Sequence, residues 1–206
     1  MTHQKKTWFY LFSAPVIIAL FIVVVIPFFY GIYYSFTDWN GVSEAALVGF
    51  SNYSKLLKDQ EFWTSIWFTT KFAFVAIILI NAIGLGLALL VTNKFKGANL
   101  LRTIFFMPNL IGGLILGFIW QFIFINAFSA IGDVLNSTGL KTWLSTPETG
   151  FWAMVIVMCW QMSGYVMVIY ISYLQSVDDA LLEASDLDGA SAFQKFWHVK
   201  FPLIMP

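Results

Sequence analysis

Carboxylates are the side chains of this sequence whose type and spacing point most directly to chemistry. Five of the eleven acidic residues fall close together near the end of the chain, at Asp178, Asp179, Glu183, Asp186 and Asp188. A charged segment that follows a long apolar run cannot itself cross a bilayer. We therefore expect this segment to be a loop that offers its carboxylates to a soluble partner.

A second set of side chains could bind a ligand from within the apolar runs, namely Asn109, Trp120, Gln121, Gln161 and Tyr165. Polar groups in a bilayer cost free energy unless they have partners, so these residues either hold helices together or line a polar pathway. An uncharged lining of amides and aromatic rings would suit a neutral polyhydroxylated solute. An ion pathway would more often include intramembrane carboxylates, which the apolar runs lack.

Catalytic and metal-binding motifs are absent from the sequence. It contains neither G-x-x-x-x-G-K-[ST] nor H-E-x-x-H, so the chain is expected to be no enzyme and to bind no cofactor or metal itself. His3 and His198 are too far apart in sequence to suggest a pair. Cys159 is the only cysteine, which excludes an internal disulfide and favours a small buried or lipid-facing hydrophobe.

The composition indicates an integral membrane protein. Of the 206 residues, 59% are hydrophobic and 11% are charged, against roughly 25% charged residues in soluble domains. The mean hydropathy is +0.78. Basic and acidic residues cancel, which argues against nucleic acid as a partner.

The elements that carry these polar residues follow from the uncharged runs at 7–37, 72–93, 103–132 and 149–177. About 20 apolar residues suffice for one transmembrane helix. We predict an all-α membrane protein, a polytopic bundle whose spans lie near 9–34, 66–92, 104–127 and 151–175. Residues 38–63 would form an outer interfacial segment, and residues 176–202 the acidic loop.

Basic residues predict the orientation of the spans. Lys5 and Lys6 precede a run that is too long for a signal peptide and has no A-x-A-like site, so an uncleaved anchor is preferred. The cytoplasmic side is expected to be the one with more basic residues, which places the N-terminus and residues 176–202 there. That side would hold Lys5, Lys6, Lys94, Lys96, Arg102, Lys195 and Lys200, and the other Lys55, Lys58 and Lys141.

Small and polar residues mark one face of each later span. In the second span the stripe consists of Thr70, Asn81, Gly84 and Ala88, which favours helix contact over solute binding. Asn109, Gly113, Gly117 and Trp120 would share a face of the third span, and Gln161, Tyr165 and Ser172 a face of the fourth.

The acidic loop has the local signals of two short helices joined at an angle. Ser176, Asp178 or Asp179 can cap the first helix, and Gly189 can end it. Ser191 and Gln194 fit a capping box for the second helix, and Pro202 ends that helix or begins another span. Phe193, Phe196 and Trp197 would share one of its faces. The segment could lie on the inner leaflet, but its acidic first half favours a protein partner instead.

The sequence Glu183-Ala184-Ser185-x-x-Asp188-Gly189-Ala190 closely resembles the "EAA" loop of permease subunits in binding-protein-dependent ATP-binding-cassette (ABC) importers. Phe196, Val199 and Phe201-Pro202-Leu203-Ile204-x-Pro206 complete the likeness, and the maltose and glycerol-phosphate branch fits best. Supporting residues are Asn52-Tyr53, Phe62-Trp63, Arg102-x-x-Phe105-x-x-Pro108, Trp120, Gly132 and Leu135-Asn136. Ser185 and Phe201 depart mildly from the pattern. The family continues beyond the equivalent of Pro206, so a C-terminally truncated fragment is expected.

The resemblance implies one subunit of an ATP-driven importer in a bacterial cell membrane. A second homologous permease subunit would complete the path for a sugar or related polyol, and an extracellular solute-binding protein would deliver the solute. A cytoplasmic ATPase would bind ATP and Mg²⁺ and grip the 183–206 loop. Its contacts would include Glu183, Ala184, Asp186, Gly189, Ala190, Phe196 and Pro202. The alternatives are a passive channel and a scaffold or signalling subunit that docks a cytoplasmic protein.

Overall fold

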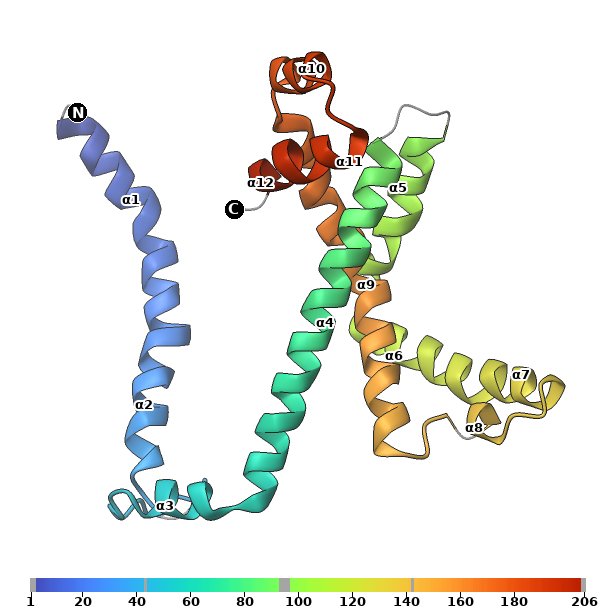
Figure 1. Ribbon diagram of the computed structural model, residues 1–206. Helices are drawn as coiled ribbons and strands as arrows, with labels where there is room; N and C mark the ends of the chain where they lie inside the picture. Colours follow the sequence, from blue (N-terminus) through green and yellow to red (C-terminus); the bar gives the residue numbers. More distant parts are fainter. Residues whose placement is uncertain (1–2, 43, 93–96, 142, 205–206) are drawn as a thin grey trace. The chain divides into compact units, whose positions relative to one another are not determined.

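The computed structural model of the chain describes residues 3–42, 44–92, 97–141 and 143–204. Lys94, Lys96 and Pro206 lie outside these ranges, as do the side chains of Lys5, Lys6 and Lys141. The elements formed by the described residues are all helices, which confirms the predicted fold class (Figure 1). Four are long and apolar enough to cross a membrane: Trp8–Ser35, Gln60–Thr92, Gly113–Val134 and Pro147–Ser176.

The chain forms two compact units, residues 1–68 and 69–206. In the first unit, α1 (His3–Leu20), η1 (Phe21–Val25) and α2 (Ile26–Ser35) follow one another as one helical run. The turn of π-helix in η1 ends two residues before Pro27. Proline has no N–H and clashes with the preceding turn, and a widened turn relieves both problems. The helical run therefore accommodates Pro27 by means of a π-turn.

The outer segment of the first unit is held by side-chain hydrogen bonds. Asn52 Nδ2 donates to the carbonyl oxygens of Ser35 at 3.0 Å and Thr37 at 2.7 Å. Thr37 also forms an antiparallel bridge with Leu47. These contacts fix the start of α3 (Ser51–Lys58) against the end of α2.

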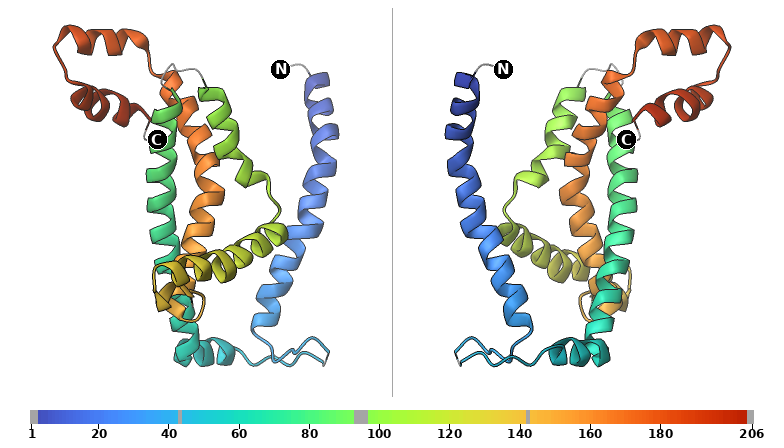
Figure 2. Two further views of the ribbon diagram at one scale, coloured as in Figure 1. Left: turned by 90° about the vertical axis from the view of Figure 1, so that its right-hand side faces the viewer. Right: turned by 90° about the vertical axis from the view of Figure 1, so that its left-hand side faces the viewer.

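The second unit is built on α4 (Gln60–Thr92) and α9 (Pro147–Ser176), which run side by side in the same direction (Figures 1 and 2). One buried cluster joins the middle of α4 to the first half of α9, and another joins the last halves of the two helices. The first contains Ala76, Ile80, Phe151, Val155 and Cys159, and the second Ala88, Val91, Met167 and Ile171.

Much of the small and polar stripe predicted for α4 makes helix contacts. Ala88 is fully buried, and a Cβ on Gly84 would lie 2.7 Å from Val166 Cγ1 of α9. Asn81 Oδ1 accepts a hydrogen bond of 2.9 Å from the Tyr170 hydroxyl. Thr70 is exposed. The helix-contact interpretation is thus confirmed for Asn81, Gly84 and Ala88.

The predicted single helix over 104–127 is wrong, because the chain leaves the helical conformation at Ile111 and Gly112. Pro108 removes a backbone donor, and Gly112 and Gly113 each cost about 1 kcal/mol relative to alanine in a helix. The chain turns at this break (Figure 2). The pieces are α5 (Ala98–Phe106), η2 (Met107–Leu110), α6 (Gly113–Phe122), η3 (Ile123–Ala127) and α7 (Phe128–Val134).

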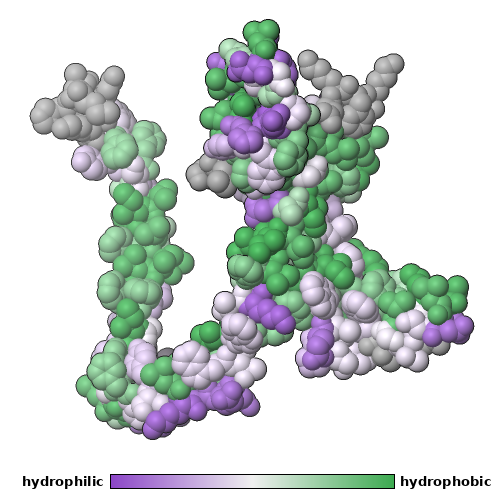
Figure 3. Space-filling view, viewed as in Figure 1, coloured by the Kyte–Doolittle hydropathy of each residue, from purple (hydrophilic) through white to green (hydrophobic). Residues whose placement is uncertain are grey.

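The remaining short helices lie at opposite ends of the second unit. α8 (Thr138–Lys141) lies near the start of α9. At the other end, α10 (Asp179–Leu187), α11 (Ala192–Lys195), η4 (Phe196–Lys200) and α12 (Phe201–Ile204) form the acidic loop. Hydrophilic surface gathers over this loop, whereas the long helices are mostly hydrophobic (Figure 3).

Candidate functional site

The acidic loop has the two-helix form predicted from its capping residues. Asp178 Oδ1 accepts a hydrogen bond of 2.9 Å from the Ala180 amide and caps α10. Gly189 follows α10 with a φ of +75°, a conformation that residues with a Cβ adopt only with strain. Ser191 and Gln194 form a complete capping box at the start of α11. These three predictions are confirmed.

The second loop helix continues through Pro202 to Ile204. A π-turn, η4, precedes the proline, as η1 precedes Pro27. Phe196 contacts the rings of Trp197 and Phe201, with centroids 5.4 and 5.9 Å apart. Ile204 is 1% exposed. The aromatic contacts and this buried end make the segment a defined structural element.

An ion pair between Lys195 Nζ and Asp186 Oδ1 joins the two loop helices. This pair was not predictable from the sequence, because the partners are nine positions apart and belong to different helices. A hollow of about 410 Å³ lies in the angle between the helices. It is lined by Ser185, Asp188, Gly189, Ala190, Gln194, His198 and Val199.

The residues predicted to contact an ATPase differ in their surroundings. Glu183, Ala184 and Pro202 are exposed, and Phe196 and Ala190 are half-buried. Within the described part of the chain, the side chain of Glu183 makes no hydrogen bond or ion pair. Its carboxylate is therefore available to a partner, whereas that of Asp186 is already engaged by Lys195.

Three of the five predicted path residues, Trp120, Gln121 and Gln161, meet around one cavity of about 330 Å³. We call it the polar cavity. It is lined by Phe72, Gly117, Trp120, Gln121, Phe124, Leu144, Gly150, Ala153, Met154, Val157, Met158 and Gln161. The indole Nε1 of Trp120 is buried and has no hydrogen-bond partner among the described residues. An indole N–H and two amides thus share an otherwise apolar cavity.

The other two predicted path residues lie elsewhere. Asn109 belongs to η2, before the helix break, and its Nδ2 lies 3.6 Å from Met162 Sδ. The break therefore separates it from the helix face that it was expected to share with Trp120. Tyr165 is 49% exposed on α9 and does not line the polar cavity.

The described residues contain no cluster of three or more His, Cys, Asp or Glu that could hold a metal. Two short helices with a free carboxylate, and a cavity of amides and aromatic rings, are therefore the candidate sites. Residues 80–206 match the family described as "Binding-protein-dependent transport system inner membrane component". The chain belongs to this permease family.

Individual relatives of this permease are transport proteins too. It is 56% identical to the probable starch degradation products transport system permease protein AmyD of Thermoanaerobacterium thermosulfurigenes, over 98% of this chain and 70% of that protein. It is 31% identical to the multiple sugar-binding transport system permease protein MsmF of Streptococcus mutans, over 100% and 73%. The trehalose/maltose transport system permease protein MalF of Thermococcus litoralis is 29% identical, over 100% and 71%.

Solved structures share the fold of the permease. The crystal structure of a bacterial ABC transporter involved in the import of the acidic polysaccharide alginate matches with a TM-score of 0.79 and 21% identity. The match covers 98% of this chain and 69% of that chain. A second structure of a bacterial alginate ABC transporter, in complex with an alginate pentasaccharide-bound periplasmic protein, matches with a TM-score of 0.84 and 19% identity.

Sequence reasoning missed a positioning role for one residue of this permease. Arg102 Nη2 donates a hydrogen bond of 3.0 Å to the Val91 carbonyl oxygen, near the end of α4. A guanidinium group suits this place because the last carbonyls of a helix lack partners and carry partial negative charge. Arg102 thereby fixes α5 against the end of α4. The R-x-x-F-x-x-P spacing singles out Arg102 in the sequence, but it does not identify the group to which the guanidinium donates a hydrogen bond.

Proposed function

We propose that this permease forms part of the membrane path for a sugar or related polyol, and that the solute passes through the polar cavity. The observation that carries the proposal is the meeting of an unpartnered indole N–H with two amides. The names of the relatives support the solute class, because they refer to starch degradation products, trehalose, maltose and multiple sugars.

The chemistry of the polar cavity suits a sugar. A ligand site usually has an apolar lining with a few placed polar groups, and the polar cavity has this composition. The C–H faces of a sugar ring can lie against Trp120 and Phe124, while its hydroxyl groups bond the side chains of Gln121 and Gln161. A buried donor without a partner costs about 1–3 kcal/mol, which a solute hydroxyl on Trp120 Nε1 would offset.

The acidic loop would transmit motion of the ATPase to the helices that form the path. A separate ATPase would hold the exposed Glu183 carboxylate and the apolar side chains of Leu187 and Phe193, which are 90% and 71% exposed. Gly189 sets the angle between the two docked helices. Reversal of a conformational ratio from 1:99 to 99:1 takes about 5.5 kcal/mol of differential binding, which ATP and a solute-binding protein would share.

The proposed orientation places the acidic loop in the cytoplasm of a bacterial cell, and the N-terminus on the same side. Within the second unit, α5 and the acidic loop lie at one end (Figure 1), and they carry Arg102, Lys195 and Lys200. Basic residues favour the cytoplasmic side. A second homologous permease subunit would complete the path, and ATP and Mg²⁺ would bind to the ATPase alone.

Uptake of labelled maltotriose by the complete importer tests the proposed path. Gln161→Leu keeps the approximate size of the side chain but removes its hydrogen-bonding groups. We expect about ten-fold slower uptake, from the loss of bonds to the solute. Gln175→Leu is the matched control, because Gln175 is exposed on the same helix and does not line the polar cavity.

Equal uptake by the Gln161→Leu and Gln175→Leu variants would contradict a solute path through the polar cavity. Uptake that continues without ATP would favour a passive channel. A complex that binds a cytoplasmic protein but takes up no sugar would favour the scaffold alternative.

A further inference from the structure

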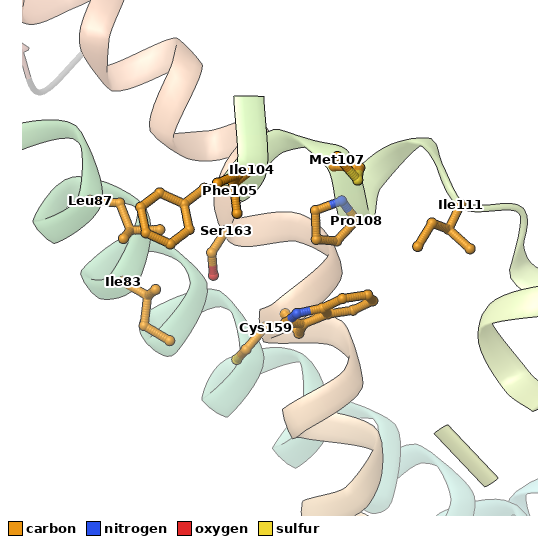
Figure 4. Close-up of a pocket in the computed structure, with 11 residues that line it drawn as sticks. Ile83, Leu87, Ile104, Phe105, Met107, Pro108, Ile111, Cys159 and Ser163 are labelled. Atoms are coloured by element: carbon orange, nitrogen blue, oxygen red, sulfur yellow. The ribbon is translucent and has the colours of Figure 1, made fainter. Parts of the chain in front are cut away.

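A second cavity, of about 520 Å³, lies between α4, α9 and the segment formed by α5 and η2. We call it the apolar cavity. It shares no lining residue with the polar cavity. Its lining, drawn in Figure 4, consists of Ile83, Leu87, Ile104, Phe105, Met107, Pro108, Ile111, Cys159, Trp160, Ser163 and Gly164.

Ser163 provides the only side-chain hydroxyl in this lining. The residue is 3% exposed, and its Oγ is buried without a hydrogen-bond partner among the described residues. Serine within a helix commonly donates to a carbonyl one turn earlier. Ser163 does not do so, and its oxygen lies among the surrounding apolar side chains (Figure 4).

Water is a poor partner for this hydroxyl. An ordered buried water needs two to four polar partners, whereas the other side chains of the lining are apolar except for the indole of Trp160. A buried hydroxyl that lacks a bond is unfavourable. A ligand that fits the cavity should therefore be mostly apolar and carry one hydrogen-bonding oxygen for Ser163.

The size of the apolar cavity and its open rim suit a ligand with a flexible aliphatic chain. A cavity of about 150 Å³ is enough for benzene, so this one holds a considerably larger molecule. Ile104, Met107 and Trp160 are 47%, 54% and 41% exposed, so no described residue covers the rim of the cavity at these positions. Because α4 and α9 are predicted to span the bilayer, a molecule dissolved in the hydrocarbon can reach this rim.

The helix backbones around the apolar cavity are tightly fixed. A Cβ on Gly164 would lie 1.9 Å from the Phe105 carbonyl oxygen, so α5 and α9 touch through their backbones. A Cβ on Gly84 would lie 3.2 Å from the Ser163 carbonyl oxygen. These two contacts leave little room for the helices to close on one another, so the cavity is already formed before a ligand enters.

We propose that the apolar cavity binds an aliphatic lipid with a single hydroxyl group, such as a long-chain alcohol, and that Ser163 Oγ hydrogen-bonds this hydroxyl. The chain of the lipid would lie against Ile83, Leu87 and Phe105. Pro108 precedes the helix break and Ile111 lies in it, and both line the same cavity, so an occupied cavity would restrain movement there. This site is independent of the solute that the permease carries.

Photolabelling of the assembled importer in its native membrane tests the proposal. The probes are dodecanol and dodecane, each with a diazirine on the chain, and labelled residues are identified by mass spectrometry of peptides. We expect dodecanol to label the lining residues at about five-fold lower concentration than dodecane, the effect of one net hydrogen bond. Ser163→Ala should remove this difference.

Ser172→Ala is the matched control, because it is the same substitution at an exposed position of the same helix. It should preserve the preference for dodecanol. Leu87→Trp, which fills the apolar cavity, should abolish labelling of Cys159 and Ile104. Equal labelling by the two probes, or a preference that persists in Ser163→Ala, would overturn the proposal.

Discussion

The helix bundle and the acidic loop of the second unit are held together by different forces. In the bundle, α4 and α9 meet through buried apolar clusters and through Gly84, and α9 meets α5 through Gly164; neither glycine leaves space for a Cβ. In the loop, caps, an ion pair and contacts between partly exposed rings determine the shape. Substitutions that disturb packing in the bundle should therefore reduce the stability of the fold. Substitutions in the loop should instead reduce coupling to the ATPase and leave the bundle intact.

The largest expected effect in this comparison belongs to the bundle. Gly164→Ala places a Cβ 1.9 Å from a backbone oxygen that cannot move aside. Overpacking of this kind costs about 3 kcal/mol. The midpoint of thermal unfolding in detergent should fall sharply. Gly86→Ala is the matched control, since nothing lies within 4 Å of its Cβ position, and this variant should be at least as stable as the parent. Equal unfolding midpoints for Gly164→Ala and Gly86→Ala would contradict the close contact between Gly164 and the Phe105 carbonyl oxygen.

A loop substitution should change partner binding without changing the fold. Glu183→Lys reverses an exposed charge that makes no bond within the described residues. We expect about ten-fold weaker association with the ATPase, in line with loss of a charge-assisted contact. Co-purification in detergent measures the association. Glu183→Gln preserves size and isolates the effect of charge. Unchanged recovery of the ATPase with Glu183→Lys would rule out this contact.

The cap of α10 should have a smaller and more local effect. Asp178→Ala removes the acceptor for the Ala180 amide, and loss of such a cap costs about 1 kcal/mol. Amide hydrogen exchange should become about five-fold faster in α10 and stay unchanged in α9. Faster exchange throughout α9 would mean that the loop and the bundle do not behave as separate regions.

The ion pair should contribute least. In this pair Asp186 is 61% exposed and Lys195 is 19% exposed, and pairs that solvent reaches contribute about 0.2–1 kcal/mol. A double-mutant cycle with Asp186→Asn and Lys195→Met should give a coupling energy of that size, and added salt should reduce it. A coupling energy above about 2 kcal/mol would contradict the view that the caps and Gly189, not this pair, determine the loop angle.

The loop was more predictable from sequence than the arrangement of the predicted path residues. Asp178, Gly189 and Ser191 act on neighbouring backbone groups, so their effects are encoded locally. The spans were visible because hydrocarbon excludes charge. The break at Ile111 and Gly112 was missed because the apolar run continues through it. A single helix was therefore expected over 104–127, where the chain in fact turns.

Tertiary contacts explain the remaining differences between prediction and structure. Gln161 and Trp120 line one cavity because the ring of Trp120 in α6 contacts that of Trp160 in α9, whereas Asn109 is separated from them by the break. No sequence feature distinguishes Ser163 from other serines in apolar helices, and only the structure reveals its unpartnered oxygen. Gln161 and Ser163 are two positions apart, about 200° around a helix, which is why they line different cavities.

ATP hydrolysis by the complete importer in proteoliposomes tests most directly whether the acidic loop couples an ATPase to the bundle. In the parent protein, a solute-loaded binding protein should stimulate hydrolysis. Gly189→Val forces a β-branched residue into a φ of +75° and should remove this stimulation while membrane insertion and bundle stability stay normal. Gly189→Asn, which tolerates this conformation better, should retain much of it. Full stimulation in Gly189→Val would contradict the coupling role.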